Sequence, residues 1–369
     1  MRTGDGTADR LGTVTRTDQT RVGLRTPTGE DVIDRNDIVS AHVMAAAAKA
    51  PTPAAEAMPS PSELQLILSS TWAPAEATWL NRDNIAAELA EAESEADPSV
   101  RSHHGWLLRA SSGVTNRGNS VLPTGDPGLD IDEALKAATE WYRARRLPAN
   151  VCVFSASTQA RVADNPLDTR LSEAGWRTVN QSYVLTAETA ALAEGAERAG
   201  GVSSDSVRPS DSLRFEMLET PTEEAIQALG GPTGDTERQV WLQLLDSAPE
   251  QVFVHAVGVR PDGSTLLVGV ARLATASKWA VLTDLVVRPD LRRRGAGRAI
   301  VRAAAAHARA RGIRRMALQV ATENTAALQL YNAVGFELHH RYHYRVEPDT
   351  GNPVSGQAAA GSEPAASAG

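Results

Sequence analysis

The sequence predicts an α/β (α+β) fold, that is, helices together with mixed central sheets, and more than one domain. The chain of 369 residues is long enough for two or three domains. In its last third an apolar strand, 285–287, runs through a proline and several arginines into a Gly-x-Gly turn and a helix. The order strand, helix, strand, helix, strand occurs twice along the chain, which indicates a divergent internal repeat.

Changes in composition divide the chain into five segments. The runs 11–15, 20–24 and 37–43 are β-like and separated by turns, which resembles a small SH3-like barrel. Alanine and proline then predict a linker, and the small residues of the C-terminus predict disorder. The expected segments are an SH3-like β-barrel (1–46), a linker (47–61), a first α/β half (62–200), a second α/β half (212–347) and a disordered tail (348–369).

The two halves differ at the turn that precedes their first helix. Residues 124–130 read Thr-Gly-Asp-Pro-Gly-Leu-Asp, whereas residues 292–297 read Arg-Arg-Arg-Gly-Ala-Gly. Acidic side chains repel a pyrophosphate, whereas arginine donates hydrogen bonds to phosphate oxygens. We therefore expect the first half to be a non-catalytic partner that completes the substrate cleft.

The turn in the second half is suited to a phosphate-bearing ligand. Gly295 and Gly297 let backbone N–H groups approach a ligand closely, and the helix that follows adds its positive end. The form Arg292-x-x-Gly295-x-Gly297, after a strand that ends in Val-x-Pro, resembles the acetyl-CoA-binding signature of the GNAT superfamily of N-acetyltransferases. A later segment, 323–336, resembles a second GNAT motif with Asn324 and Tyr331 on one face of a helix.

This resemblance implies tandem GNAT folds and acetyl-CoA as co-substrate. No metal is implied, because the His-His-x-x-His run at 339–343 lacks the helical glutamate of a zinc hydrolase. The resemblance also implies that the asparagine contacts the cofactor and that the tyrosine protonates the departing thiolate. From the residues alone, Tyr331 is equally compatible with a core position and Asn324 with a helix N-cap. The implied cofactor-binding residues are Leu285, Val286, Val287, Arg292, Arg293, Arg294, Gly295, Ala296, Gly297, Arg298, Asn324 and Tyr331.

Attack on a thioester requires a neutral amine, so a group must accept a proton. Asp284, at the head of the cofactor-binding strand, is the first candidate for this base, and Glu323 is the second. Histidines 339, 340 and 343 are further candidates because histidine titrates near neutrality. With Tyr331 as the acid, the candidate catalytic residues are Tyr331, Asp284 and Glu323.

A closer resemblance is to an actinobacterial group that combines an SH3-like start with two GNAT halves. Residues 105–123 and 339–345 carry it. Members are named N-acetylglutamate synthases or histone-type acetyltransferases, so the acceptor is a small amine or a protein lysine. A cleft between two halves favours a small ligand. Arg109, Arg117 and Arg341 are the candidate residues for binding L-glutamate, and a non-catalytic acetyl-CoA-binding protein is a third alternative.

Composition narrows the partners and the location. The net charge of −8 argues against a general nucleic-acid binder. No apolar run is long enough for a membrane span, and the first residues lack the apolar core of a signal peptide. The single cysteine, Cys152, lies in a strand-like run typical of packing. We expect a cytoplasmic protein without membrane or specific nucleic-acid partners.

Overall fold

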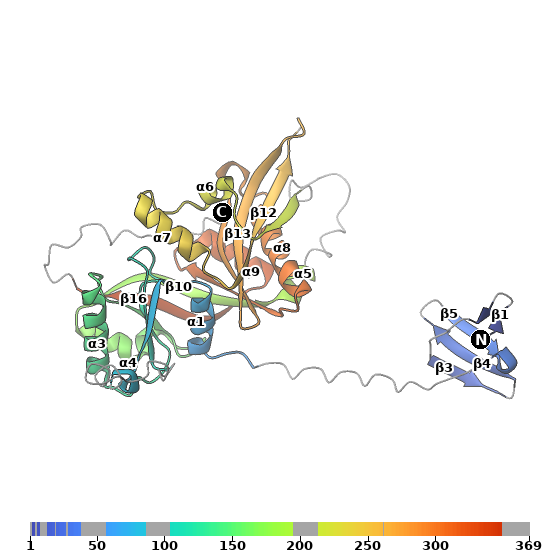
Figure 1. Ribbon diagram of the computed structural model, residues 1–369, viewed down its shortest axis with the longest axis horizontal. Helices are drawn as coiled ribbons and strands as arrows, with labels where there is room; N and C mark the ends of the chain where they lie inside the picture. Colours follow the sequence, from blue (N-terminus) through green and yellow to red (C-terminus); the bar gives the residue numbers. More distant parts are fainter. Residues whose placement is uncertain are drawn as a thin grey trace, which may run out of the picture. The chain divides into compact units, whose positions relative to one another are not determined.

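The chain divides into two compact units, Met1–Met58 and Pro59–Gly369 (Figure 1). The computed structural model describes residues 2–3, 6–7, 13–18, 20–26, 29–37, 57–85, 104–194, 213–260 and 262–348. The predicted tail lies outside the described residues except for Pro348, as does the predicted linker up to residue 56.

The N-terminal unit contains a three-stranded antiparallel sheet in the order β3-β4-β5 and a short β1-β2 pair. Two of the predicted strands overlap β3 and β4, but the described third strand is β5 rather than 37–43. Its first residue, Gly29, pairs with Thr26, so the chain folds back directly after β4. Asp37 lies in a 3-10 helix (Arg35–Asp37), and residues 38–43 lie outside the described residues. Closure into an SH3-like barrel stays a prediction. The strands are β1 (Arg2–Thr3), β2 (Gly6–Thr7), β3 (Thr13–Thr17), β4 (Arg21–Thr26) and β5 (Gly29–Asp34).

The second unit is built on one mixed sheet of 11 strands in the order β11-β12-β13-β14-β15-β10-β16-β9-β8-β7-β6. None of the helices described here is long and apolar enough to cross a membrane. The strands are β6 (Glu76–Leu80), β7 (Trp106–Ala110), β8 (Val121–Pro123), β9 (Asn150–Phe154), β10 (Arg177–Glu188), β11 (Arg214–Leu218), β12 (Glu250–Val259), β13 (Thr265–Ala276), β14 (Trp279–Val287), β15 (Arg315–Ala321) and β16 (Glu337–Val346). The helices are α1 (Pro61–Ser70), α3 (Ile131–Ala144), α4 (Pro166–Glu173), α5 (Thr189–Glu194), α6 (Glu223–Leu229), α7 (Asp235–Leu245), α8 (Ala296–Ala310) and α9 (Thr325–Val334).

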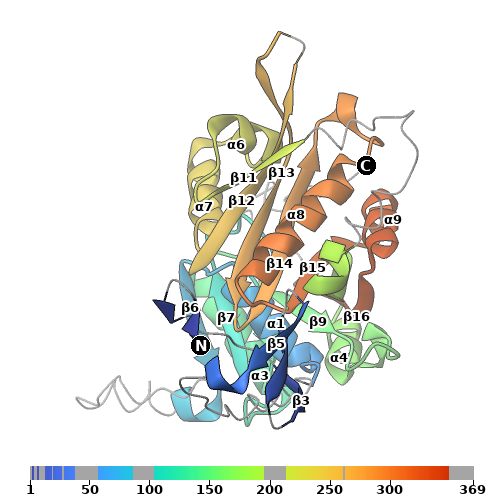
Figure 2. The ribbon, with the colours of Figure 1, turned by 90° about the vertical axis from the view of Figure 1, so that its right-hand side faces the viewer.

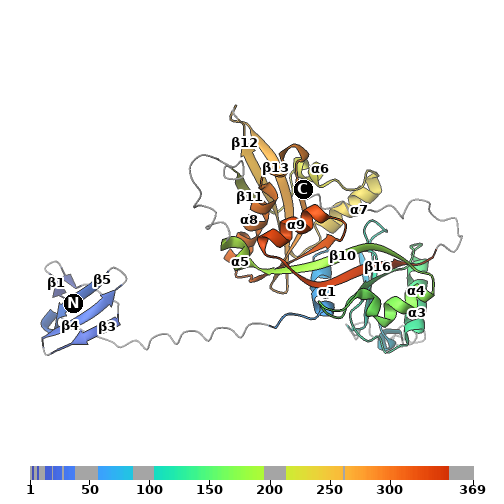
Figure 3. The same cartoon turned by 180° about the vertical axis from the view of Figure 1, so that it is seen from behind.

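The strand order is symmetric about the β10–β16 pair. Strands β6-β7-β8-β9 on one side correspond to β12-β13-β14-β15 on the other, and each set has its helix, α3 or α8, between its two parallel strands. The last strand of each half pairs with the other half: β10 with β15, and β16 with β9. Figure 3 shows both long strands running from one half into the other. The halves therefore share a sheet instead of forming two separate ones.

Helices cover the second half of the sheet on both faces. On one face α8 lies along β12, β13 and β14 (Figure 2) and buries Ile300, Val301 and Ala304 against them. On the other face α6 and α7 enclose Trp241 and Phe253. Because both faces are buried, the strands between them are almost continuously apolar, which is typical of central strands.

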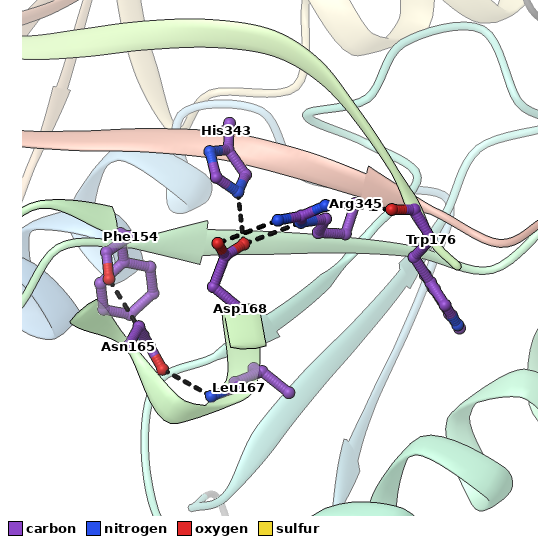
Figure 4. Close-up of polar contacts among 7 residues, drawn as sticks. All are labelled: Phe154, Asn165, Leu167, Asp168, Trp176, His343 and Arg345. Atoms are coloured by element: carbon purple, nitrogen blue, oxygen red, sulfur yellow. Dashed lines mark hydrogen bonds and ion pairs between the residues drawn. The ribbon is translucent and has the colours of Figure 1, made fainter. Parts of the chain in front are cut away.

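A buried ion-pair cluster fastens β16 to the first half (Figure 4). Asp168 of α4 accepts hydrogen bonds from Arg345 at 2.8 and 3.0 Å, and its Oδ1 lies 2.6 Å from Nε2 of His343. Arg345 also donates to the carbonyl oxygen of Trp176. Burial alone raises the pKa of Asp168, but the hydrogen bonds from Arg345 and His343 outweigh it and leave this pKa lowered. The predicted candidate His343 thus has a structural partner.

Replacement of Asp168 by asparagine should lower the free energy of unfolding by about 3–5 kcal/mol, because it leaves Arg345 buried without a counter-charge. Urea unfolding followed by circular dichroism measures this. The matched control is Asp164→Asn, which breaks the exposed pair with Arg161 and should lower the free energy of unfolding far less. Equal losses in the two variants would contradict a fastening role for Asp168.

Candidate active site

Strands β14 and β15 separate part-way along their length. Their parallel pairing runs from Trp279 opposite Arg315 to Leu282 opposite Leu318 and ends there. Strand β14 continues to Val287, still paired with β13 on its other side. From 284 to 287 the edge that faces away from β13 therefore makes no ladder with any described strand. An open strand edge inside a sheet can accept an extended ligand as an added strand.

The separation begins at a bulge in β14. Val286 pairs with Val270 and Thr283 with Arg272, so Asp284 and Leu285 together face only Ala271. Asp284 has a φ of 54°, a conformation that is strained for a residue other than glycine. Its Oδ2 is buried and has no hydrogen-bond partner among the described residues. The bulge thus turns a carboxylate oxygen into the interior where the two strands part.

The turn after β14 presents a row of free backbone donors. The backbone N–H groups of residues 293–298 donate no hydrogen bond to any described residue, and the first donor in α8 outside this row is that of Ala299. Gly295 has a φ of 89° at the N-cap, which glycine adopts without strain. At position 297 glycine is favoured by packing and not by backbone conformation, because a Cβ there would lie 3.1 Å from Cδ2 of Leu330. Close packing of α8 on α9 therefore favours glycine at 297.

The arginines of the turn divide into two groups. Arg292 folds back and donates from Nε to the carbonyl oxygen of Val287 at 3.1 Å. Arg293, Arg294 and Arg298 are exposed and form no ion pair within the described part of the chain. This turn therefore suits an anion, because three guanidinium groups without an ion pair in the described residues lie next to a row of free N–H groups.

Helix α9, which packs on α8 through Leu330, carries Tyr331 and begins after Asn324. The Asn324 side chain accepts a hydrogen bond from the N–H of Ala327 at 3.1 Å, so it is the N-cap. Tyr331 is 4 % exposed and packs edge-on against Phe336. Burial raises the pKa of the Tyr331 phenol, and the charge of Asp284 raises it further. The phenol thus keeps its proton, and it lies within electrostatic range of the bulge carboxylate.

The remaining predicted residues are spread over the sheet. Glu323 is exposed. Arg109 of β7 is buried and donates to Oγ and the carbonyl oxygen of Ser120, whereas Arg341 of β16 donates to the carbonyl oxygen of Thr158. Three strand spacings, about 14 Å, separate β7 from β16, so the structure does not bring these two guanidinium groups together. Arg117 lies elsewhere, beside the Trp72 ring.

Histidines 339 and 340 form a chain of hydrogen bonds between β16 and the start of α1. Gln65 Nε2 donates to His340 Nε2, so Nδ1–H of His340 donates to Nδ1 of His339, whose Nε2–H donates to the carbonyl oxygen of Pro59. This arrangement requires both rings to be neutral. Burial lowers the pKa of His339, and burial together with His339 lowers the pKa of His340 to about 3. These histidines fasten α1 rather than line the candidate active site.

Comparison with known proteins agrees with this geometry. Residues 217–336, from β11 to the end of α9, match the model of the acetyltransferase (GNAT) family. These residues are a GNAT acetyltransferase domain, and the protein is an acetyl-CoA-dependent acyltransferase. Its second unit combines that domain, through the shared sheet, with a first half of corresponding strand order.

Relatives of this acyltransferase extend over both halves. The chain is 26% identical over 259 residues to the uncharacterized N-acetyltransferase YobR of Bacillus subtilis, covering 66% of this chain and 90% of that protein. Among solved structures, a GCN5-related N-acetyltransferase from Kribbella flavida covers 72% of this chain and 95% of its own, at 17% identity and a TM-score of 0.44. A tandem GNAT protein from the clavulanic acid biosynthesis pathway covers 74% and 98%, at 12% identity and a TM-score of 0.45.

The sequence prediction missed Arg272 and Trp72, two buried polar groups near the bulge. Arg272 lies at the centre of β13 with 0% exposure, and Trp72 follows α1 with 3% exposure. Arg272 could have been found from its charge, because residues 266–274 are otherwise apolar or glycine. A charged side chain in such a strand is buried, which costs folding free energy unless the charge is paired or binds a ligand. Among the described residues no group of three or more histidine, cysteine, aspartate or glutamate side chains is arranged to hold a metal ion.

The neutral pair of histidines should make stability depend on pH. His340 has a pKa of about 3 in the folded chain against 6.5 when exposed, so the unfolded chain binds more protons between these values. Stability is complete above about pH 6.5 and falls as the pH drops towards 3, at about 1.4 kcal/mol per pH unit for this group. Urea unfolding at pH 6.5 and 4.5 should show a loss that is smaller in His340→Gln by roughly 1–3 kcal/mol. His104→Gln, which changes an exposed histidine, should keep the wild-type loss; a His340→Gln variant that also keeps it would contradict the assignment.

Proposed function

We propose that this acyltransferase transfers acetyl from acetyl-CoA to a primary amine at the separation of β14 and β15. The observation that carries the proposal is the coincidence of an unpaired strand edge at 284–287 with a row of free backbone N–H groups at 293–298. The first suits the amides of a pantetheine arm, and the second suits a pyrophosphate. A long ligand with both chemical features fits these two surfaces in sequence.

The residues for such a cofactor are those of the edge, the turn and α9. Leu285, Val286 and Val287 would pair with the arm, and the N–H groups around Gly295 and Gly297 would hold the phosphates. Arg293, Arg294 and Arg298 would add charged hydrogen bonds. Asn324 already caps α9, so it would shape the site through the start of that helix.

The chemistry follows from the groups at the bulge. Acetyl-CoA supplies an acetyl group activated as a thioester. Asp284 takes a proton from the acceptor ammonium, the amine nitrogen then bonds to the acetyl carbon, and the carbon–sulfur bond breaks. Tyr331 gives its proton to the sulfur and regains one from the new amide nitrogen, so one proton is released per turnover. Glu323 is the second candidate for the base, but it is exposed, whereas Asp284 turns a buried oxygen inward.

The acceptor is proposed to be a small amine, with L-glutamate as the first choice, which would make the chain an N-acetylglutamate synthase of arginine biosynthesis. The alternative acceptor is a protein lysine. Support for the small ligand comes from the first half of the chain, whose loop with Arg117 packs against α7 of the second half, since a substrate cleft walled by two halves favours a small ligand. Thiol release from acetyl-CoA with glutamate and with a lysine peptide distinguishes the two.

Arg293 and Arg294 should contribute to cofactor affinity. We expect the double Arg→Gln variant at 293 and 294 to bind acetyl-CoA at least tenfold more weakly by calorimetry, since a charged hydrogen bond contributes about 1.5–3 kcal/mol. The control is Arg309→Gln, which removes an exposed arginine from the other end of α8 and should leave the affinity unchanged. Unchanged affinity in the double variant would remove the turn from the cofactor site.

Tyr331 should govern turnover and not cofactor binding. Tyr331→Phe is expected to lower kcat by roughly 10²-fold, the scale of an acid–base group, with little change in acetyl-CoA affinity. Tyr142→Phe provides the comparison, because it removes another buried hydroxyl, one that donates to the Arg109 carbonyl oxygen in the first half. If Tyr331→Phe kept the kcat of the wild type, Tyr331 would be a core residue only.

A further inference from the structure

Arg272 is a buried cation, and one of its three side-chain nitrogens has no hydrogen-bond partner among the described residues. Its Nε donates to Gln251 Oε1 at 2.7 Å and its Nη2 to the carbonyl oxygen of Thr71 at 2.8 Å. Gln251 is itself fixed, because its amide donates to Asp246 at 2.9 Å. The third nitrogen, Nη1, is buried and has no hydrogen-bond partner among the described residues. A buried guanidinium nitrogen without a hydrogen-bond partner lowers the stability of the fold, unless a ligand accepts a hydrogen bond from it.

The surroundings of Arg272 favour an anionic ligand. The guanidinium carbon of Arg272 lies 4.8 Å from the centroid of the Trp72 ring, and that of Arg117 lies 5.5 Å from it. Burial lowers the pKa of Arg272 to about 10, and the charge of Arg117 contributes, yet the group stays protonated at neutral pH. Trp72 adds a donor, since its buried Nε1 has no partner among the described residues. Two cations thus lie against the ring of Trp72, whose own N–H has no partner among the described residues.

The opposite charge lies on the neighbouring strand. Arg272 pairs across the β13–β14 ladder with Thr283, the residue before Asp284. The carboxylate of Asp284 favours the charged form of Arg272, so the two groups are within electrostatic range. Both Thr283 Oγ1 and Asp284 Oδ2 are buried without hydrogen-bond partners in the described residues. Unsatisfied donors for an anion therefore adjoin unsatisfied acceptors for a cation.

We propose that Arg272, Trp72 and Arg117 bind the carboxylate of the acceptor while Asp284 receives its ammonium group, so that the acceptor is a free amino acid. This inference rests on the proposed acetyl transfer and assigns its substrate class. A lysine within a protein has no free carboxylate next to its amine, so it would leave Arg272 unsatisfied. In this site the first half would take part in binding the acceptor, because the first half supplies Trp72 after α1 and Arg117 from the β7–β8 loop.

The test compares free amino acids, glutamate included, with their α-carboxamides in the thiol-release assay. The full-length enzyme should favour the free acids by about 10²-fold in kcat/KM. Arg272→Gln should raise KM for the acids by about 10- to 100-fold, the range of a charged hydrogen bond, with KM for the amides and kcat nearly unchanged. Arg315→Gln is the matched control, because it removes another arginine stacked on a tryptophan, Trp279, away from the bulge.

A second variant decides the question if Arg272→Gln does not fold. Trp72→Phe keeps an aromatic ring under both arginines but replaces the indole by a smaller ring that has no N–H, so it should raise KM for the acids severalfold and leave the amides unaffected. A wild-type enzyme that acetylates amides as well as acids, or a folded variant that retains the full acid preference, would overturn the carboxylate site. Calorimetry separates this from failure of the proposed function: a protein that does not bind acetyl-CoA fails on both counts, whereas one that binds it and acetylates amines without acid preference fails only here.

Discussion

The exchange of the last strands between the halves is the constraint on which the rest of the second unit depends. Because β10 pairs with β15 and β16 with β9, neither half completes its sheet alone. Strand β10 also occupies the edge of β15 opposite to β14, so β15 is held while β14 diverges from it beyond Leu282. The Asp168–Arg345 cluster and the His339–His340 chain both act on β16, which fixes the position of this last strand.

The candidate active site lies at the opening between β14 and β15. One local irregularity, the bulge at Asp284, both ends the ladder and turns a carboxylate inward. The same opening leaves a strand edge for an extended cofactor and leads to the free N–H groups before α8. The first half reaches β13 beside this bulge, because Trp72 and Arg117 lie against Arg272, which faces Thr283 across the ladder. The proposed catalytic, cofactor and acceptor groups thus depend on one register shift in a single strand.

Local signals in the sequence were sufficient for part of this structure. The turn with Gly295 and the helix that ends at Gly335 were predicted correctly, since a positive φ and a helix stop are properties of single residues and their neighbours. Strand exchange was not predicted, because partner choice between distant strands leaves no local trace. For the same reason Arg109 and Arg341 were grouped as ligands of one substrate although β7 and β16 lie apart. Arg272 shows what was overlooked: a lone charge in an apolar strand.

Hydrogen–deuterium exchange with and without acetyl-CoA can locate the cofactor site in solution, because amides that gain a hydrogen-bond partner exchange more slowly. Acetyl-CoA should slow exchange of the amides at 284–287 and 293–298, while those of the corresponding turn in the first half, 124–130, should be unchanged. Protection of residues 124–130 without protection of 293–298 would contradict this cofactor site.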